Sequence, residues 1–181
     1  MSDEFASTER NRNLWAPWRM AYIDTLSDAV PKDGCFLCRY RDDPAADAAN
    51  LVLFRGAKAF VVMNRFPYSS GHCLVAPYVH MAGMEDLDEP TMLEMMLLLR
   101  DTQAVLGQAL HCEGFNVGIN IGRCAGAGLP GHLHMHIVPR WGGDTNFMSV
   151  LGAVRVIPQT LEQLYDQILA AAGKLGVPAK R

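Results

Sequence analysis

A histidine stands at every second position of an apolar run between Gly131 and Pro139, and this alternation constrains the fold more than any other feature. The three residues are His132, His134 and His136. Alternate side chains of a β-strand share a face, so the imidazoles would line one side and the apolar residues the other. Imidazole acts near neutral pH as a nucleophile, proton carrier or metal ligand. The spacing therefore predicts a strand with one reactive face.

The size and charge of the chain favour one domain that binds small molecules. Its 181 residues, half of them apolar, suffice for a single well-packed core. A formal charge of −3 gives no broad attraction to nucleic acid or to an anionic membrane. The apolar runs are too short to span a bilayer, and the polar start lacks signal-peptide features, so we expect a cytoplasmic protein. Five cysteines fit reduced thiols or a metal site better than a disulfide framework.

Local patterns predict five strands, at 51–54, 59–63, 72–76, 115–121 and 132–139. Asp88 and Pro90 predict the cap and first turn of a long helix that ends near Cys112, and a second helix is predicted over 161–172. The segment 41–47 predicts a loop. Six residues of the long helix are expected in the core: Met92, Met95, Met96, Leu99, Leu106 and Leu110. The order of elements predicts an α+β fold in which helices cover a five-stranded antiparallel sheet.

Two kinds of site could use the alternating histidines. Imidazoles two residues apart on a strand can share a zinc ion. Alternatively, one imidazole attacks phosphorus in line and forms a phosphoramidate, while its neighbours hold the tautomer and the oxyanion. Glycines at 122, 126, 128 and 131 precede and flank the histidines, and their backbone N–H groups can approach phosphate oxygens. This loop favours the second alternative.

The run from His132 to Val138 resembles the His-φ-His-φ-His-φ-φ signature of the histidine triad (HIT) superfamily of nucleotide hydrolases and transferases. Segments 60–65, 71–77 and 116–120 resemble the family in the same order. Trp15-Ala-Pro-Trp-Arg19 and the segment 139–147 further resemble the branch of bacterial diadenosine tetraphosphate phosphorylases. We therefore expect an N-terminal aromatic arm over 1–34, a HIT domain over 35–142 and a C-terminal extension with a helix over 143–181.

The resemblance implies a role for each matching residue. His134 would be the nucleophile on the α-phosphate, His136 would bind a phosphate or leaving-group oxygen, and His72 would support them. Asn64 would bind the ribose hydroxyls, and the phosphates would contact Asn120, Gly126 and Gly128. The implied activity is cleavage of dinucleoside polyphosphates, such as diadenosine tetraphosphate, by a homodimer through a covalent nucleotidyl intermediate on His134.

A second motif, Cys35-x-x-Cys38, is half of a tetrahedral zinc site by its spacing, and equally fits a redox pair or two buried thiols. Similarity to bacterial HIT proteins implies that this pair, with His80 and His132, holds a structural zinc ion. His132 would then bind metal while His134 stays free to attack.

One departure from the family concerns the residues four and three positions before the first triad histidine. Many HIT hydrolases have glutamine and serine or threonine there, whereas this chain has Gly128 and Leu129. The smaller Gly128 leaves room for a second phosphate as acceptor, which would make the reaction phosphorolysis. The alternatives are a nucleoside phosphoramidate hydrolase, a nucleotide-binding protein without turnover, and a hydrolase with zinc on all three triad histidines.

Overall fold

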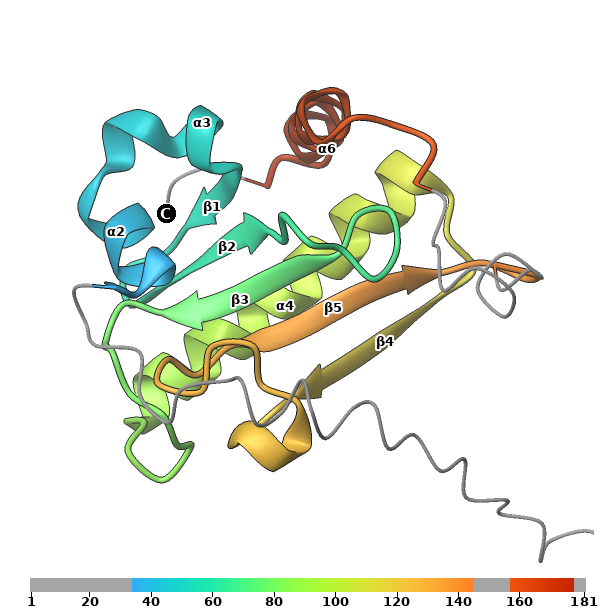
Figure 1. Ribbon diagram of the computed structural model, residues 1–181. Helices are drawn as coiled ribbons and strands as arrows, with labels where there is room; N and C mark the ends of the chain where they lie inside the picture. The colour runs from blue at the N-terminus through green and yellow to red at the C-terminus, as the bar shows by residue number, and fades with distance from the viewer. Residues whose placement is uncertain (1–33, 145–156, 178–181) are drawn as a thin grey trace, which may run out of the picture.

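The structure is a computed structural model that describes residues 34–144 and 157–177 (Figure 1). Of the predicted arm over 1–34 it describes Gly34 alone, so Trp15 to Arg19 lie outside the described residues, as does 145–156 of the predicted extension. The elements in chain order are α2 (Phe36–Asp42), η2 (Pro44–Ala46), α3 (Asp47–Asn50), β1 (Val52–Arg55), β2 (Ala59–Met63), β3 (Cys73–Pro77), α4 (Glu89–Leu110), β4 (Gly114–Ile119), η3 (Arg123–Ala125), β5 (Met135–Arg140) and α6 (Leu161–Leu175).

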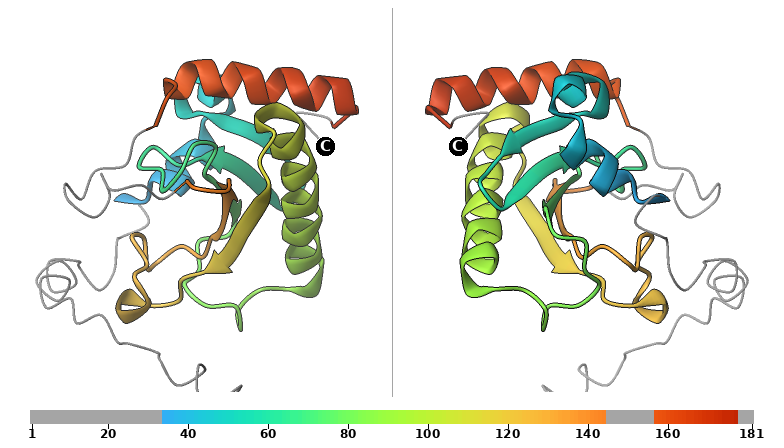
Figure 2. Two further views of the ribbon diagram at one scale, coloured as in Figure 1. Left: turned by 90° about the vertical axis from the view of Figure 1, so that its right-hand side faces the viewer. Right: turned by 90° about the vertical axis from the view of Figure 1, so that its left-hand side faces the viewer.

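The five strands form one antiparallel sheet in the order β1-β2-β3-β5-β4, which confirms the predicted fold class. The long helix α4 lies across one face of the sheet, and α6 packs beside α4 at the β1 end (Figures 1 and 2). Asp88 caps α4 by accepting a hydrogen bond from the N–H of Thr91, as its position predicts. None of the described helices combines the length and apolar character needed to cross a bilayer.

Side chains alternate between the two faces of the sheet, and each face contributes to a separate hydrophobic core. One core lies under α4 and α6 and includes Val61 and Ile137. The other lies under α2 and includes Val62 and Leu74. His136 is the cross-strand partner of Leu74, so it faces the α2 side of the sheet. The reactive face predicted from the alternation is therefore the face that α2 partly covers.

Some predicted boundaries are wrong for identifiable reasons. β5 begins at Met135, so His132 and His134 precede the strand. On the neighbouring strand β3, Pro77 has no N–H with which to continue the ladder, and its carbonyl accepts a hydrogen bond from the His132 ring instead. α4 ends at Leu110 because His111 takes the left-handed conformation of a C-cap.

Two further expectations are corrected. Helix α2 and the short turn of η2 occupy much of the segment 41–47 that predicts a loop. Met96 is exposed rather than buried, because it shares the outer face of α4 with Leu93, three residues earlier.

Candidate active site

A pocket of about 530 Å³ lies on the face of the sheet that α2 partly covers. His134 and His136 lie on one wall, and Asn64 and Gly128 also line it, so four of the predicted site residues meet here. The other lining residues are Phe36, Arg39, Tyr40, Arg65, Phe66, Tyr68, Leu74 and Leu129. The lining therefore includes two arginines and no carboxylate, although the chain as a whole is acidic. Such a lining is suited to an anion with an apolar part.

A chain of hydrogen bonds sets the protons on His72 and His136. The backbone N–H of Tyr68 donates to Nδ1 of His72 over 3.1 Å, so that nitrogen carries no proton. His72 therefore holds its proton on Nε2, which lies 2.9 Å from Nδ1 of His136 and donates to it. His136 must then carry its own proton on Nε2. This atom is buried and has no hydrogen-bond partner within the described residues, so it is a donor left available for a ligand.

His134 has the opposite arrangement, which leaves a lone pair for chemistry. Its Nδ1 lies 2.7 Å from the backbone oxygen of His132. A carbonyl oxygen only accepts, so Nδ1 carries the proton and Nε2 is the unprotonated nitrogen. His134 is only 5% exposed, and its ring lies edge-on to that of His136, with centroids 4.9 Å apart. A nucleophilic nitrogen and a hydrogen-bond donor thus stand side by side.

Burial keeps these rings neutral. It lowers the pKa of His72 to about 3, helped by the nearby rings of His136 and His134. Burial and the neighbouring His134 ring lower the pKa of His136 to about 4. Burial also lowers the pKa of His134, against the raising effect of its bond to the His132 carbonyl. At neutral pH the cluster is therefore uncharged, as nucleophilic attack by an imidazole requires.

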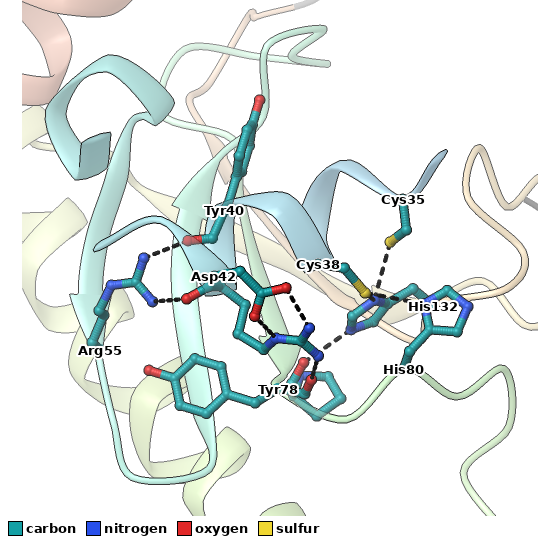
Figure 3. A network of polar contacts seen from close by, with 10 residues as sticks. Cys35, Cys38, Tyr40, Asp42, Arg55, Tyr78, His80 and His132 are labelled. Carbon is teal, nitrogen blue, oxygen red and sulfur yellow. Dashed lines mark hydrogen bonds and ion pairs between the residues drawn. The ribbon is translucent and has the colours of Figure 1, made fainter. Parts of the chain in front are cut away.

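The predicted metal ligands Cys35, Cys38, His80 and His132 form a second cluster (Figure 3). The four ligand atoms all lie within 4.8 Å of one another. Nδ1 of His132 lies 3.2 Å from Sγ of Cys35 and 3.6 Å from Sγ of Cys38, and Nδ1 of His80 lies 3.3 Å from Sγ of Cys38. Tetrahedral bonds to sulfur and nitrogen would place such atoms about 3.5 Å apart. These four residues could hold a metal ion.

Proton positions and thiol chemistry also fit a cation in this cluster. Nε2 of His132 donates to the backbone oxygen of Pro77 over 2.9 Å, so its Nδ1 is unprotonated and faces the thiols. Burial and the adjacent Cys35 raise the pKa of Cys38 to about 11. A bound divalent cation would supply the positive charge that keeps two buried thiolates ionised.

The structure separates the remaining predicted residues from this pocket. Asn120 and Gly126 are not among its lining residues. Gly126 has a φ of 86°, and its N–H donates to the Arg123 carbonyl within the loop. His72 also lies outside the lining but contacts it through His136.

Most of the other pocket residues are not predicted from the sequence as site residues, and they include two groups close together in the chain. Phe36, Arg39 and Tyr40 come from α2, whose last two residues fall in the predicted loop 41–47, and their helical spacing is the available signal. Phe66 and Tyr68 come from the turn-rich segment before His72, where nothing in the sequence marks them as site residues.

Comparisons with known proteins agree with this geometry. The HIT domain profile matches residues 45–143 of the chain. The chain is 38% identical over 158 residues to a protein named AP-4-A phosphorylase from Mycobacterium tuberculosis, a match that covers 83% of this chain and 78% of the relative. It is 30% identical over 93 residues to the asymmetrical bis(5'-nucleosyl)-tetraphosphatase of Schizosaccharomyces pombe, covering 51% of this chain and 50% of that protein.

A solved structure shares the fold across almost its full length. The crystal structure of a Zn-bound histidine triad family protein from Mycobacterium smegmatis superimposes with a TM-score of 0.65 at 25% identity. The match covers 80% of this chain and 97% of that one. Together with the triad geometry and the profile match over more than half of its length, this shows that the chain belongs to the HIT family.

Proposed function

We propose that this protein cleaves dinucleoside polyphosphates by transferring a nucleotidyl group first to His134 and then to inorganic phosphate. The observation that carries the proposal is the complementary pair of tautomers, an unprotonated Nε2 on His134 beside a buried, unpartnered Nε2–H on His136. The names of the M. tuberculosis and S. pombe relatives support the substrate class.

In the first step, Nε2 of His134 attacks the α-phosphorus and a P–N bond forms. The bond from that phosphorus to the bridging oxygen breaks, and the leaving nucleoside polyphosphate takes the electron pair. His136 donates a hydrogen bond from Nε2 to the developing negative charge, and His72 holds it in that tautomer through the 2.9 Å contact. In the second step, an oxygen of inorganic phosphate attacks the same phosphorus and the P–N bond breaks, which regenerates the neutral imidazole.

The rest of the pocket accounts for the other parts of the nucleotide. Phe36, Tyr40 and Leu74 supply an apolar wall for a nucleobase. The Asn64 carboxamide accepts from the Phe66 N–H over 2.9 Å and donates from Nδ2 to Nδ1 of His72 over 3.3 Å. Its remaining lone pair and its second N–H can bind ribose hydroxyls. Contacts of Asn120 and Gly126 with the phosphates remain part of the proposal.

Gly128 is the reason for proposing phosphate rather than water as the acceptor. It lines the pocket beside the triad, and a Cβ built on it would meet no atom within 4 Å. The side-chain donors that many HIT hydrolases place here are absent, and the open space can admit a second phosphate.

We further propose that the Cys35, Cys38, His80 and His132 cluster holds a structural zinc ion, because two thiolates and two imidazoles suit zinc. The ion would supply positive charge that fixes the ligand-bearing segments together, with no part in bond breaking. We also propose that the protein is a homodimer, as is common in the family.

Product analysis tests the function directly. Diadenosine tetraphosphate and inorganic phosphate are incubated with the protein, and nucleotides are separated by ion-exchange chromatography. ATP plus ADP is expected. ATP plus AMP would show that water, and not phosphate, is the acceptor. Measurable binding without any product would show a nucleotide-binding protein without turnover.

A further inference from the structure

An aromatic rim, Phe66 and Tyr68, borders the pocket on the connection between β2 and β3. Phe66 is 85% exposed, more than any other large apolar side chain in the described residues, and Tyr68 is 45% exposed. A phenylalanine that stays in water gives up the hydrophobic stabilisation of burial, so fold stability does not explain it here. An exposed aromatic at the mouth of a pocket is typical of a binding surface.

Two residues of the candidate active site, Asn64 and His72, bind the backbone of the aromatic rim. The N–H of Phe66 donates to the Asn64 side chain over 2.9 Å, and that of Tyr68 donates to Nδ1 of His72 over 3.1 Å. The Tyr68 ring stacks on the His136 ring, with centroids 5.9 Å apart and an angle of 20° between the planes. The aromatic rim is therefore positioned before substrate binds, directly beside the group that faces the leaving nucleotide.

The size of the pocket indicates what the aromatic rim would contact. A volume of about 530 Å³ is that of a site for one small ligand. The apolar wall and Asn64 would take up the base and ribose of the nucleotidyl group that reaches His134. The leaving nucleotide would then extend from the α-phosphate past His136, on which the Tyr68 ring stacks, and Phe66 lines the same pocket.

We propose that the aromatic rim is the subsite for the second nucleobase of the dinucleoside polyphosphate, with Phe66 as its stacking surface. This inference rests on the proposed function and adds how substrates with two nucleosides are distinguished from those with one. Stacking on an aromatic ring needs no particular base edge, so this subsite accepts different bases. It selects for the presence of a second nucleoside rather than for its identity.

The test compares two substrates with the same adenylyl group and a polyphosphate leaving group. Diadenosine tetraphosphate carries a second adenosine, and adenosine 5'-tetraphosphate does not. The measured quantity is the ratio of their kcat/KM values in the wild type, Phe66→Ala and Phe66→Trp. The matched control is Leu93→Ala, an exposed apolar residue of α4 outside the pocket lining.

Stacking of one base is worth about five- to 150-fold in affinity, so Phe66→Ala should lower the ratio about tenfold. Phe66→Trp should restore it, and Leu93→Ala should leave it as in the wild type. A ratio that Phe66→Ala does not change would overturn the subsite, even if both substrates turn over. If the wild type turns over neither substrate, the proposed function fails, and the ratio of the two dissociation constants measured by calorimetry decides the subsite by the same criteria.

Discussion

Hydrogen-bond partners decide which nitrogen of each buried histidine carries a proton, and this gives neighbouring residues of the same type different chemistry. His132, His134 and His136 alternate in the sequence but differ in tautomer. His132 points an unprotonated Nδ1 at two thiols, whereas His134 keeps an unprotonated Nε2. His136 keeps a protonated Nε2 because His72 donates to its other nitrogen. Neutral rings and fixed tautomers are both needed for the proposed chemistry.

Replacing His134 by alanine should abolish turnover and leave the fold intact. The variant removes the only proposed nucleophile, so we expect kcat to fall at least about a thousandfold. Mass spectrometry of wild-type protein quenched during turnover with diadenosine tetraphosphate should show one added adenylyl group on the peptide containing His134. Turnover by His134→Ala comparable to that of the wild type would contradict the assignment of the nucleophile.

The lowered pKa values of His72 and His136 predict how stability depends on pH. The unfolded histidines titrate near 6.5, while the folded ones have pKa values of about 3 and about 4. Between these values the unfolded chain binds more protons, so the stabilisation is present above pH 6.5 and is lost as the pH falls toward about 4 for His136 and about 3 for His72. Each histidine should lower the free energy of unfolding by up to about 1.4 kcal/mol per pH unit in this range.

Urea unfolding at several pH values between about 7 and 5 measures this slope. The double variant His72→Gln with His136→Gln is the matched control, and it should show a shallower dependence on pH. An equal slope in the two proteins would mean that these rings are not kept neutral by the fold.

At the scale of elements, the metal cluster joins segments that are distant in the sequence. Cys35 and Cys38 lie at the start of α2, His80 follows β3, and His132 precedes β5 (Figure 3). A metal bound there would hold α2 against the sheet on the side where Phe36 and Tyr40 line the pocket. The proposed ion would thus support the nucleotide pocket without taking part in the reaction.

Replacing Cys35 by alanine should therefore remove bound zinc and lower stability. Because the energy of binding a structural metal contributes to folding, we expect Tm to fall by about 10 °C. Zinc content is measured by atomic absorption and Tm by calorimetry. His134→Ala is the matched control, since it changes a triad histidine outside the cluster and should retain both values. Loss of zinc in His134→Ala would contradict the division of roles between His132 and His134.

For the whole molecule, the β4 edge of the sheet is the feature that bears on assembly, because no other strand of residues 34–144 and 157–177 pairs with it there. β4 is one of the two edge strands, and its central Val117 is 47% exposed. An exposed edge strand with an apolar residue is a template for pairing with another strand. A two-fold axis beside β4 would join two sheets and bury this residue in both copies.

Replacing Val117 by lysine should dissociate the proposed dimer. Light scattering coupled to size exclusion should give the wild type about twice the chain mass of 19.9 kDa, and the variant about that mass itself. Met84→Lys, which changes an exposed apolar residue in the connection between β3 and α4, should remain a dimer. A wild-type protein that elutes as a monomer would overturn the proposal.

Much of the fold could be predicted because local rules agree with the tertiary structure. The Asp88 cap, the strand over 59–63 and the five-stranded antiparallel sheet follow from short-range patterns, and β2 has the predicted bounds. The division into domains at residue 35 and residue 142 remains a prediction. The start of β5 could not be predicted, because Pro77 lies far away in the sequence and limits the ladder only after the strands pair.

The sequence by itself determined which side chains are candidates for the chemistry, since their spacing and type are local: three alternating histidines, a Cys-x-x-Cys pair and a glycine-rich loop. Only the tertiary structure decided which nitrogen of His132 and of His136 carries the proton, because the partners that set these two tautomers come from β3 and from His72, which the loop before it orients. The tautomer of His134 is set locally, by the backbone oxygen of His132. The tertiary structure also brought Phe36, Tyr40 and the aromatic rim to the pocket. The type of a side chain sets which reactions it can take part in, but its neighbours and its protonation depend on how the segments of the chain pack together.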